Sequence, residues 1–269
     1  MTAPILKYPG AKWALSSWIV SHLPQYDHYI DPYLGSGGVY FNLTWQPRHV
    51  VLNDLSGDVT NLFQVIRTRR DELIALVEMT PWSRVEYESS CERSGDELED
   101  ARRFLVRCWQ AFGTRLDKMT GWRNIGTARA ATVTLWNALP DRILAVAERL
   151  KNAEIETRPA LEVIARHRSP DVLIYADPPY VLSTRSGGRM YQHEMTDIEH
   201  QQLLDMLDEH PGPVALSGYA CALYDDRLTH WTRLTRSAHA ELASQRMEVL
   251  WLNKVATRQQ QTSLFRSDT

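Results

Sequence analysis

The chain of 269 residues is 43% hydrophobic and 23% charged, and its formal net charge is −3. These values are ordinary for a folded globular protein and exclude disordered and fibrous classes, while the length suits one large α/β domain with a smaller inserted module. The sequence has no signal-peptide pattern and no apolar run of the roughly 18 residues that a membrane span needs. We therefore expect a cytoplasmic protein without a membrane partner.

Short apolar runs alternate with helical patterns over the first part of the chain. In chain order we expect a helix over residues 13–23, a strand over 28–30, a glycine-rich turn over 31–38, a short helix over 39–43, a strand over 49–52 and a helix over 58–68. The first helix should stop before Pro24, because the residue before a proline avoids the helical conformation. The order strand, turn, helix, strand, helix predicts a parallel sheet.

Residues 67–134 have no strand pattern. Charged helical stretches alternate there with tryptophans and turn residues, which predicts an inserted, mostly helical module. Acidic side chains dominate residues 86–100, and basic side chains dominate residues 102–129. A basic segment beside an acidic one can bind a polyanion while the net charge stays near zero, but intrahelical ion pairs on a solvated face give the same pattern.

The α/β alternation resumes after this module. We expect helices over residues 135–150 and 197–209, strands over 153–157, 172–176 and 214–217, and a closing hairpin from two β-like runs at 229–236 and 246–253. The fold class is therefore α/β, with a mainly parallel sheet.

The turn from Asp31 to Gly38 has the sequence Asp-Pro-Tyr-Leu-Gly-Ser-Gly-Gly. Small residues between a strand and a helix let the backbone approach a ligand and leave the helix N-terminus open toward it. The turn matches neither the phosphate loop nor the dinucleotide fingerprint. Asp54 ends the next strand, where an acidic side chain can accept hydrogen bonds from the ribose hydroxyls of a nucleoside-containing cofactor. Alternatively, Asp54 caps the following helix.

Asp177, Pro178, Pro179 and Tyr180 directly follow the most apolar strand pattern of the chain. Two consecutive prolines stiffen the turn and remove two N–H donors. The Asp177 carboxylate and the Pro178 carbonyl can then accept the two hydrogens of an exocyclic amino group, and Tyr180 can stack on the base. A rigid loop without chemical meaning is the alternative.

With these motifs the chain resembles the Dam-like adenine-specific DNA methyltransferases. Lys7 to Lys12 is similar to their N-terminal K-[YW]-x-G-G-K element, and Asp31 to Gly37 to their D-P-F-x-G-S-G cofactor motif. Asn53-Asp54 corresponds to the ribose-binding acidic position, and residues 177–180 match the catalytic D-P-P-Y motif in full. The chain departs from the family pattern at Ala11 and Tyr33. In the family an asparagine often follows the strand expected here at 214–217. This chain has Ser217-Gly218-Tyr219 there and no asparagine.

The resemblance implies a Rossmann-like fold that binds S-adenosylmethionine (SAM), with helices on both sheet faces and a late antiparallel strand. Residues 1–66 and 135–269 form the expected catalytic domain, and residues 67–134 the expected helical target-recognition domain. The implied cofactor-binding residues are Tyr8, Lys12, Asp31, Tyr33, Gly35, Ser36, Gly37, Asp54 and Asp177. The implied catalytic residues are Asp177, Pro178, Pro179 and Tyr180.

Double-stranded DNA is the implied partner, and the target adenine must be flipped out of the helix to reach such a site. Candidate DNA contacts are Arg115, Lys118, Arg123 and Asn124 in the inserted module, and Arg185 and Arg189 in the loop after the catalytic motif, since arginine and asparagine can bind base edges and phosphates. The alternative for the last two is an ordinary surface loop. A homodimer is compatible with the sequence but not indicated by it.

No metal is expected. The chain has nine histidines without ligand spacing. Its three cysteines, Cys91, Cys108 and Cys221, have no C-x-x-C spacing and favour reduced thiols. Methyl transfer from a sulfonium needs positioning and electrostatics rather than a metal or a covalent nucleophile.

Three other functions fit part of this pattern. An RNA adenine methyltransferase would use the same D-P-P-Y chemistry, although the inserted module favours DNA. A catalytically silent DNA-binding protein on the same scaffold would have no chemical reason to keep Asp177 and Tyr180. A generic nucleotide-binding domain does not explain the catalytic tetrapeptide. Related enzymes act in restriction–modification systems, in phages or as solitary regulators, and the sequence does not indicate one of these roles.

Overall fold

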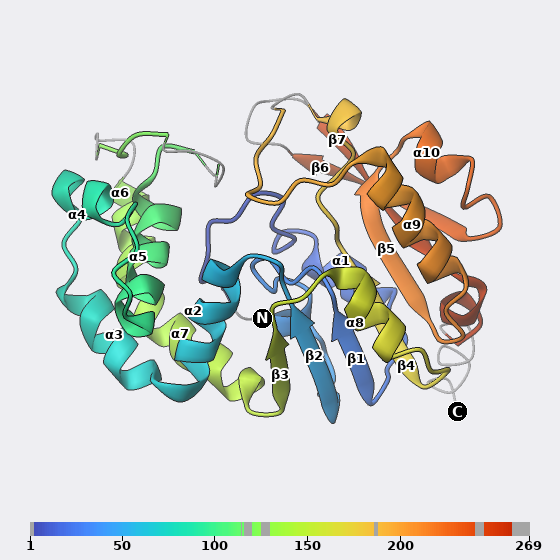
Figure 1. The fold of residues 1–269 in the computed structure, drawn as a ribbon, viewed down its shortest axis with the longest axis horizontal. Helices are drawn as coiled ribbons and strands as arrows, with labels where there is room; N and C mark the ends of the chain where they lie inside the picture. The colour runs from blue at the N-terminus through green and yellow to red at the C-terminus, as the bar shows by residue number, and fades with distance from the viewer. Residues whose placement is uncertain are drawn as a thin grey trace.

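The computed structural model describes residues 3–113, 115, 120–124, 130–185, 188–239 and 245–259. Its centre is a seven-stranded sheet in the order β3-β2-β1-β4-β5-β7-β6 (Figure 1). The strands are β1 (His28–Asp31), β2 (His49–Asn53), β3 (Ala153–Glu156), β4 (Val172–Ala176), β5 (Val214–Tyr219), β6 (Thr232–His239) and β7 (Gln245–Leu252). β1 to β5 are parallel, and β7 is antiparallel to both β5 and β6. The expected mainly parallel sheet with a closing hairpin is confirmed.

Strand residues alternate between the two faces of the sheet, as the period of two in a strand requires. Tyr29 and Leu173 belong to one hydrophobic cluster, and their neighbours Ile30 and Ile174 belong to the other. Central parallel strands are covered on both faces and therefore appear in the sequence as continuous apolar runs. β4, in which all five residues are buried, shows this most clearly.

Helices cover both faces of the sheet, as expected. The first cluster includes residues of α1 (Ser16–Ser21), α2 (Gly57–Thr68), α5 (Glu97–Gln110) and α7 (Leu139–Leu150). The second includes residues of α8 (Ala160–Arg166), α9 (Asp197–Asp208) and α10 (Ala222–Asp225). In the part of the chain that the structure describes, no helix is both long and apolar enough to cross a membrane.

The inserted module is helical, as expected, and contains α3 (Arg70–Met79), α4 (Arg84–Ser89), α5 and the start of α6 (Ala130–Asn137). These helices gather beside the β3 edge of the sheet (Figure 1). α5 packs along α2, and the Trp109 indole donates a hydrogen bond to the carbonyl of Ile5 at 2.8 Å. The module therefore shares its core with the sheet domain, and the expected boundaries at 66/67 and 134/135 fall inside α2 and α6.

Some element bounds differ from the sequence-based expectation. The first helix covers only Ser16–Ser21, because residues 12–15 form turns beside the glycine-rich segment. The expected short helix over 39–43 is a three-residue 3-10 helix, Tyr40–Asn42. The expected helix over 135–150 is two helices, α6 and α7, and the second begins with proline in its first turn, a position that proline favours. α8 was not predicted, because its seven residues bury only Val163 and Ile164.

Candidate functional site

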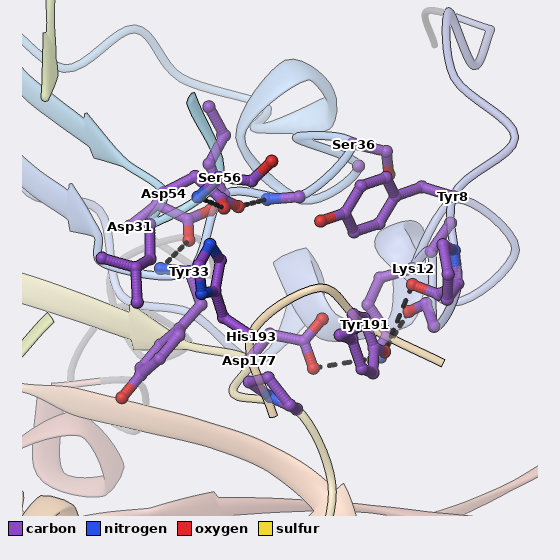
Figure 2. Close-up of a pocket in the computed structure, with 18 of the residues that line it drawn as sticks. Tyr8, Lys12, Asp31, Tyr33, Ser36, Asp54, Ser56, Asp177, Tyr191 and His193 are labelled. Carbon is purple, nitrogen blue, oxygen red and sulfur yellow. Dashed lines mark hydrogen bonds and ion pairs between the residues drawn. The ribbon is translucent and has the colours of Figure 1, made fainter. Parts of the chain in front are cut away.

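A cavity opens at the carboxyl edge of the parallel strands (Figure 2). Its lining comes from the N-terminal loop 8–12, the glycine-rich turn after β1, Asp54 to Ser56 after β2, the catalytic motif after β4, and the segment 191–195. Eight of the nine expected cofactor residues line this cavity, and Gly37 does not: Tyr8, Lys12, Asp31, Tyr33, Gly35, Ser36, Asp54 and Asp177. Parallel strands bring them together because their carboxyl ends lie at one edge of the sheet.

The glycine-rich turn needs glycine at two positions. Gly35 and Gly37 have φ angles of +49° and +68°, a region that glycine adopts without steric cost. A side chain at Gly37 would lie 2.3 Å from the Phe41 ring. The Ser36 hydroxyl accepts a hydrogen bond from the Trp13 indole at 3.0 Å and so holds the N-terminal loop. A 3-10 helix follows, so a ligand would meet the turn backbone rather than the expected α-helix N-terminus.

Asp54 joins the second strand to this turn. Its Oδ2 accepts the backbone N–H of Gly35 at 2.8 Å, and its Oδ1 accepts that of Ser56, also at 2.8 Å (Figure 2). The N-cap of α2 is Ser56, so the alternative of Asp54 as the cap is wrong. Burial raises the pKa of Asp54, and the two backbone hydrogen bonds oppose that shift. Each carboxylate oxygen keeps a further lone pair that can accept a hydroxyl from the cavity side.

Asp31 is the last residue of β1, and Asp177 directly follows the adjacent strand β4. Asp31 is 2% exposed and accepts hydrogen bonds from the Tyr33 N–H at 3.3 Å and the Tyr29 hydroxyl at 3.5 Å. Burial raises the pKa of Asp31 well above its usual value, and the nearby Asp177 raises it further. Burial also raises the pKa of Asp177, whereas Lys12 lowers it.

Lys12, expected as a cofactor-binding residue, directly contacts the catalytic motif. Its ammonium lies 3.0 Å from Asp177 Oδ1 and donates to the Gly10 carbonyl at 2.7 Å. Burial alone would lower the pKa of Lys12, but Asp177 and Glu248 outweigh burial and raise the pKa above its usual value. The preceding residue, Ala11, is exposed, so alanine replaces the family's glycine there without crowding.

Tyr180, which we expected to stack on the target base, is largely buried by its neighbours. The residue is 8% exposed, its hydroxyl donates a hydrogen bond to Glu248, and its ring centroid lies 4.6 Å from that of Tyr219 at an interplanar angle of 77°. The Lys12 ammonium lies 4.6 Å from the Tyr180 ring centroid. A flipped base can therefore stack on this ring only if a neighbouring side chain moves aside.

The loop after the catalytic motif folds back over the cavity, which the sequence did not predict. Glu194 accepts the backbone N–H groups of Met190 and Tyr191 at 2.7 and 3.1 Å and pairs with Arg185. The Tyr191 hydroxyl donates to the Pro9 carbonyl at 3.3 Å. The Arg185 side chain is only 4% exposed. The expectation that Arg185 clamps the DNA backbone is therefore corrected: it holds this loop instead.

The other candidate DNA contacts occupy different surroundings. Arg189 is exposed and, with Arg115, lines a groove between the cavity and the helical module. Asn124 is exposed as well. The Arg123 guanidinium donates to the Ala111 carbonyl at 3.0 Å and so supports the loop backbone. Lys118 lies outside the described residues.

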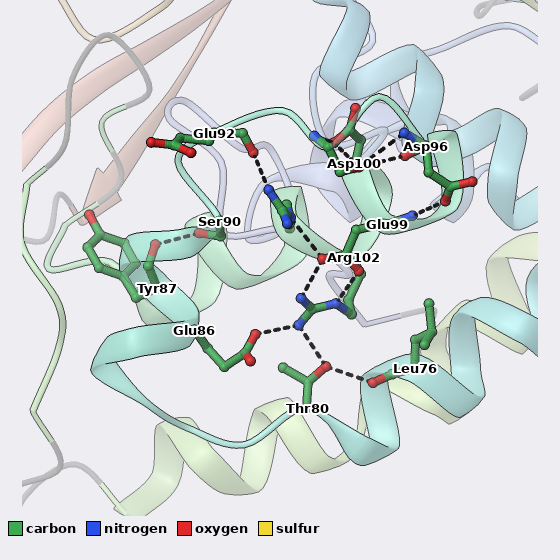
Figure 3. Close-up of polar contacts among 12 residues, drawn as sticks. Leu76, Thr80, Glu86, Tyr87, Ser90, Glu92, Asp96, Glu99, Asp100 and Arg102 are labelled. Atoms are coloured by element: carbon green, nitrogen blue, oxygen red, sulfur yellow. Dashed lines mark hydrogen bonds and ion pairs between the residues drawn. The ribbon is translucent and has the colours of Figure 1, made fainter.

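Arg102, at the start of the basic segment, contacts two residues of the acidic segment (Figure 3). Arg102 donates to Glu99 at 2.7 Å and to Glu86 at 2.6 Å, and Arg103 donates to Glu99 at 2.8 Å. Hydrogen bonds from Arg102 lower the pKa of Glu99 to about 2. Arg107 pairs with Asp58 on α2 at 2.8 Å. Only the contacts of Arg102 and Arg103 with Glu99 are the intrahelical pairs of the ion-pair alternative, and the other contacts join different helices. These three arginines do not form an unpaired cationic surface.

Comparisons with known proteins show the family of this chain. A sequence model of the D12 class N6 adenine-specific DNA methyltransferases matches residues 8–242. The DNA adenine methylase of Escherichia coli (strain K12) is 25% identical over 249 residues, which cover 86% of this chain and 87% of that protein. The type II methyltransferase M1.LlaDCHI of Lactococcus lactis subsp. cremoris is 26% identical over 268 residues, with coverages of 90% and 91%.

Proposed function

The chain belongs to the D12 class of N6 adenine-specific DNA methyltransferases, and we propose that it transfers the methyl group of SAM to the N6 amino group of an adenine flipped out of duplex DNA. One observation carries this proposal. Asp177 of the D-P-P-Y motif lines the same cavity as Asp54 and the glycine-rich turn. A nucleoside cofactor bound by the latter two would lie beside the carboxylate that receives the base.

The residues of the cavity fit SAM. Asp54 would hold the ribose hydroxyls, and Asp31, Gly35 and Ser36 would lie near the methionine portion, where the turn leaves room for close backbone approach. The buried carboxylates of the cavity suit a cationic ligand, because opposite charges attract strongly where water is excluded. SAM supplies a methyl group already activated by a positive sulfur.

Asp177 and Pro178 would orient the attacking nitrogen. The carboxylate and the proline carbonyl each accept one amino hydrogen, which directs the nitrogen lone pair toward the methyl group. Pro178 and Pro179 restrict the backbone, so these acceptors are held in place before the base arrives. Preorganised acceptors in a buried site lower the barrier because they do not reorganise during the reaction.

DNA would bind over the cavity mouth. A base inside a duplex cannot reach Asp177, so flipping is required, at a cost of a few kcal/mol of lost stacking and pairing. We place part of the DNA backbone along the groove lined by Arg115 and Arg189, because it adjoins the cavity through Tyr191 and Gln192. Residues 67–134 would supply target recognition, and the enzyme would act in the cytoplasm, where bacterial DNA lies.

Labelled SAM, unmethylated duplex DNA and the purified protein test this function. We expect label in adenine N6 with the wild-type protein and none with Asp177→Ala. RNA of the same sequence serves as the competing substrate. Transfer to RNA but not to duplex DNA would favour an RNA adenine methyltransferase. SAM binding without transfer to DNA of diverse sequence or to RNA would favour the silent scaffold.

A further inference from the structure

Glu248 is an acidic side chain in an otherwise apolar part of β7. It is 3% exposed, whereas Leu250 and Leu252, on the same side of the strand, belong to the main hydrophobic cluster. It pairs in register with Tyr219 of β5 and Arg236 of β6, so it lies inside the sheet rather than at its edge. A buried carboxylate is costly unless nearby donors compensate for lost hydration. Its partners therefore indicate why the position holds an acid.

Both close partners of Glu248 belong to the active-site motifs. The Tyr180 hydroxyl donates to Glu248 Oε1, and the Lys12 ammonium lies 3.7 Å from the same oxygen. Burial raises the pKa of Glu248, Lys12 opposes this shift, and the nearby Asp177 adds to it. Glu248 itself does not line the cavity. Its contacts with the site are made through Lys12 and Tyr180, and its charge also acts on Asp177.

Lys12 has three N–H donors and three nearby acceptors: the Gly10 carbonyl at 2.7 Å, Asp177 Oδ1 at 3.0 Å and Glu248 Oε1 at 3.7 Å. Asp177 must also accept a hydrogen from the adenine amino group. The ammonium and the amino group are both donors to this carboxylate, so the position of the ammonium at Oδ1 affects which acceptor sites remain for the base. A second carboxylate beside Lys12 gives the ammonium another acceptor when the base enters.

We propose that Glu248 is a positioning residue for methyl transfer: it shares the Lys12 ammonium with Asp177 and anchors the Tyr180 hydroxyl, and so leaves Asp177 able to accept the adenine amino group. This inference rests on the proposed function, since it concerns how the catalytic carboxylate receives its substrate. Without Glu248, the ammonium would keep Asp177 and the Gly10 carbonyl as its nearby oxygen acceptors, and Tyr180 would lose its hydroxyl partner.

Glu248→Gln tests this role, because glutamine keeps the size of the side chain and removes its charge. The matched control is Leu250→Val, which shortens an apolar side chain on the same strand face and keeps Glu248. Single-turnover methyl transfer to duplex DNA is measured with the full-length protein at saturating SAM, together with the SAM Kd and the thermal midpoint. We expect Glu248→Gln to slow transfer by roughly tenfold to a hundredfold, the range for misplaced catalytic groups, with the SAM Kd changed by less than about threefold.

A double-mutant cycle shows whether Glu248 acts through Lys12. If it does, Glu248→Gln in a Lys12→Gln background adds less than about a twofold further loss, because coupled residues are non-additive. Tyr180→Phe gives a second route if Glu248→Gln does not fold. It removes the hydroxyl that Glu248 accepts, and we expect it to slow transfer with SAM binding retained.

Three results would overturn the inference: a rate close to that of the wild type in Glu248→Gln, an equal loss in Leu250→Val, or fully additive losses in the Lys12 cycle. If Glu248→Gln does not fold, wild-type transfer by Tyr180→Phe would also overturn it. The wild-type protein separates this test from the proposed function. Absence of transfer by the wild type refutes the function itself, whereas normal transfer by both proteins refutes only the role of Glu248.

Discussion

The catalytic edge of the sheet and the helical module both hold dense sets of charged side chains, but their burial differs. The side chains of Lys12 and Glu248 are 6% and 4% exposed, whereas those of Arg103 and Glu99 in the module are 22% and 26% exposed. Water screens the outer pairs, which typically contribute at most about 1 kcal/mol. Charges that are largely excluded from water are screened less and therefore interact more strongly with a substrate. The presence of an ion pair alone therefore does not show which charged residues act on the substrate.

The sharpest test of this comparison is Asp177→Asn. The amide presents a donor where the carboxylate accepts, and it removes the partner charge of Lys12. We expect methyl transfer to fall by about a hundredfold to a thousandfold, the scale seen when one preorganised group of a catalytic site is lost. Single-turnover assays at saturating SAM measure the change, and a preserved thermal midpoint shows that the fold is intact. Transfer within a few-fold of wild type would remove Asp177 from the chemistry.

A smaller effect is expected for Asp54→Ala. This variant loses the proposed ribose acceptors and the two hydrogen bonds to Gly35 and Ser56 that shape the turn. We expect the SAM Kd to rise by roughly tenfold to a hundredfold, since each lost hydrogen bond to a charged group contributes about 1.5–3 kcal/mol. Calorimetric titration with SAM checks this. Asp58→Asn, whose carboxylate pairs with arginines of the module, serves as the control and should leave the SAM Kd unchanged.

Glu99→Gln probes the module side of the comparison. Glu99 accepts from Arg102 and Arg103, so we expect the free energy of unfolding to fall by about 1–2 kcal/mol, with the transfer rate unchanged. Denaturant titration measures the loss. A reduced rate per folded molecule would contradict the assignment of this network to structure alone.

The pH dependence of the free energy of unfolding also tests the role of the Glu99 ion pairs. In the folded protein, hydrogen bonds from Arg102 lower the pKa of Glu99 from its ordinary value of 4.5 to about 2. A depressed carboxyl pKa stabilises the fold above the unfolded value, and that contribution is lost as pH falls from 4.5 toward about 2. The stability difference between the wild type and Glu99→Gln should therefore shrink across this window. A difference that stays constant between neutral pH and pH 2 would contradict the ion-pair account.

The smallest effect is expected for Arg189→Ala. This exposed arginine lines the groove beside the cavity, so we expect weaker DNA binding for all sequences and a salt-dependence slope reduced by about 1, the signature of one phosphate contact. Arg103→Ala, in which the lost charge was already paired with Glu99, should leave the slope unchanged. Fluorescence anisotropy over a range of salt concentrations distinguishes the two. Equal slopes in both variants would place the DNA elsewhere.

The local sequence pattern was sufficient to predict the strands that position Asp31, Asp54 and Asp177. The apolar run of β4 predicted that strand to the residue, because a strand covered on both faces must be apolar throughout. The convergence of Asp31, Asp54 and Asp177 followed from the parallel order of their strands, since the carboxyl ends of such strands lie at one edge. These predictions needed only the periodicity of side chains and the direction of the chain.

Tertiary contacts decided the rest. The sequence pattern shows an acid at Glu248 and a basic loop residue at Arg185, but not that the first contacts Lys12 and Tyr180 or that the second is buried against Glu194. It likewise left open whether the arginines of the module meet DNA or their own glutamates. The physical reason is that a charge acquires its role from the groups that replace its water. For Glu248 those groups come from segments far away in the sequence, and only the folded chain brings them together.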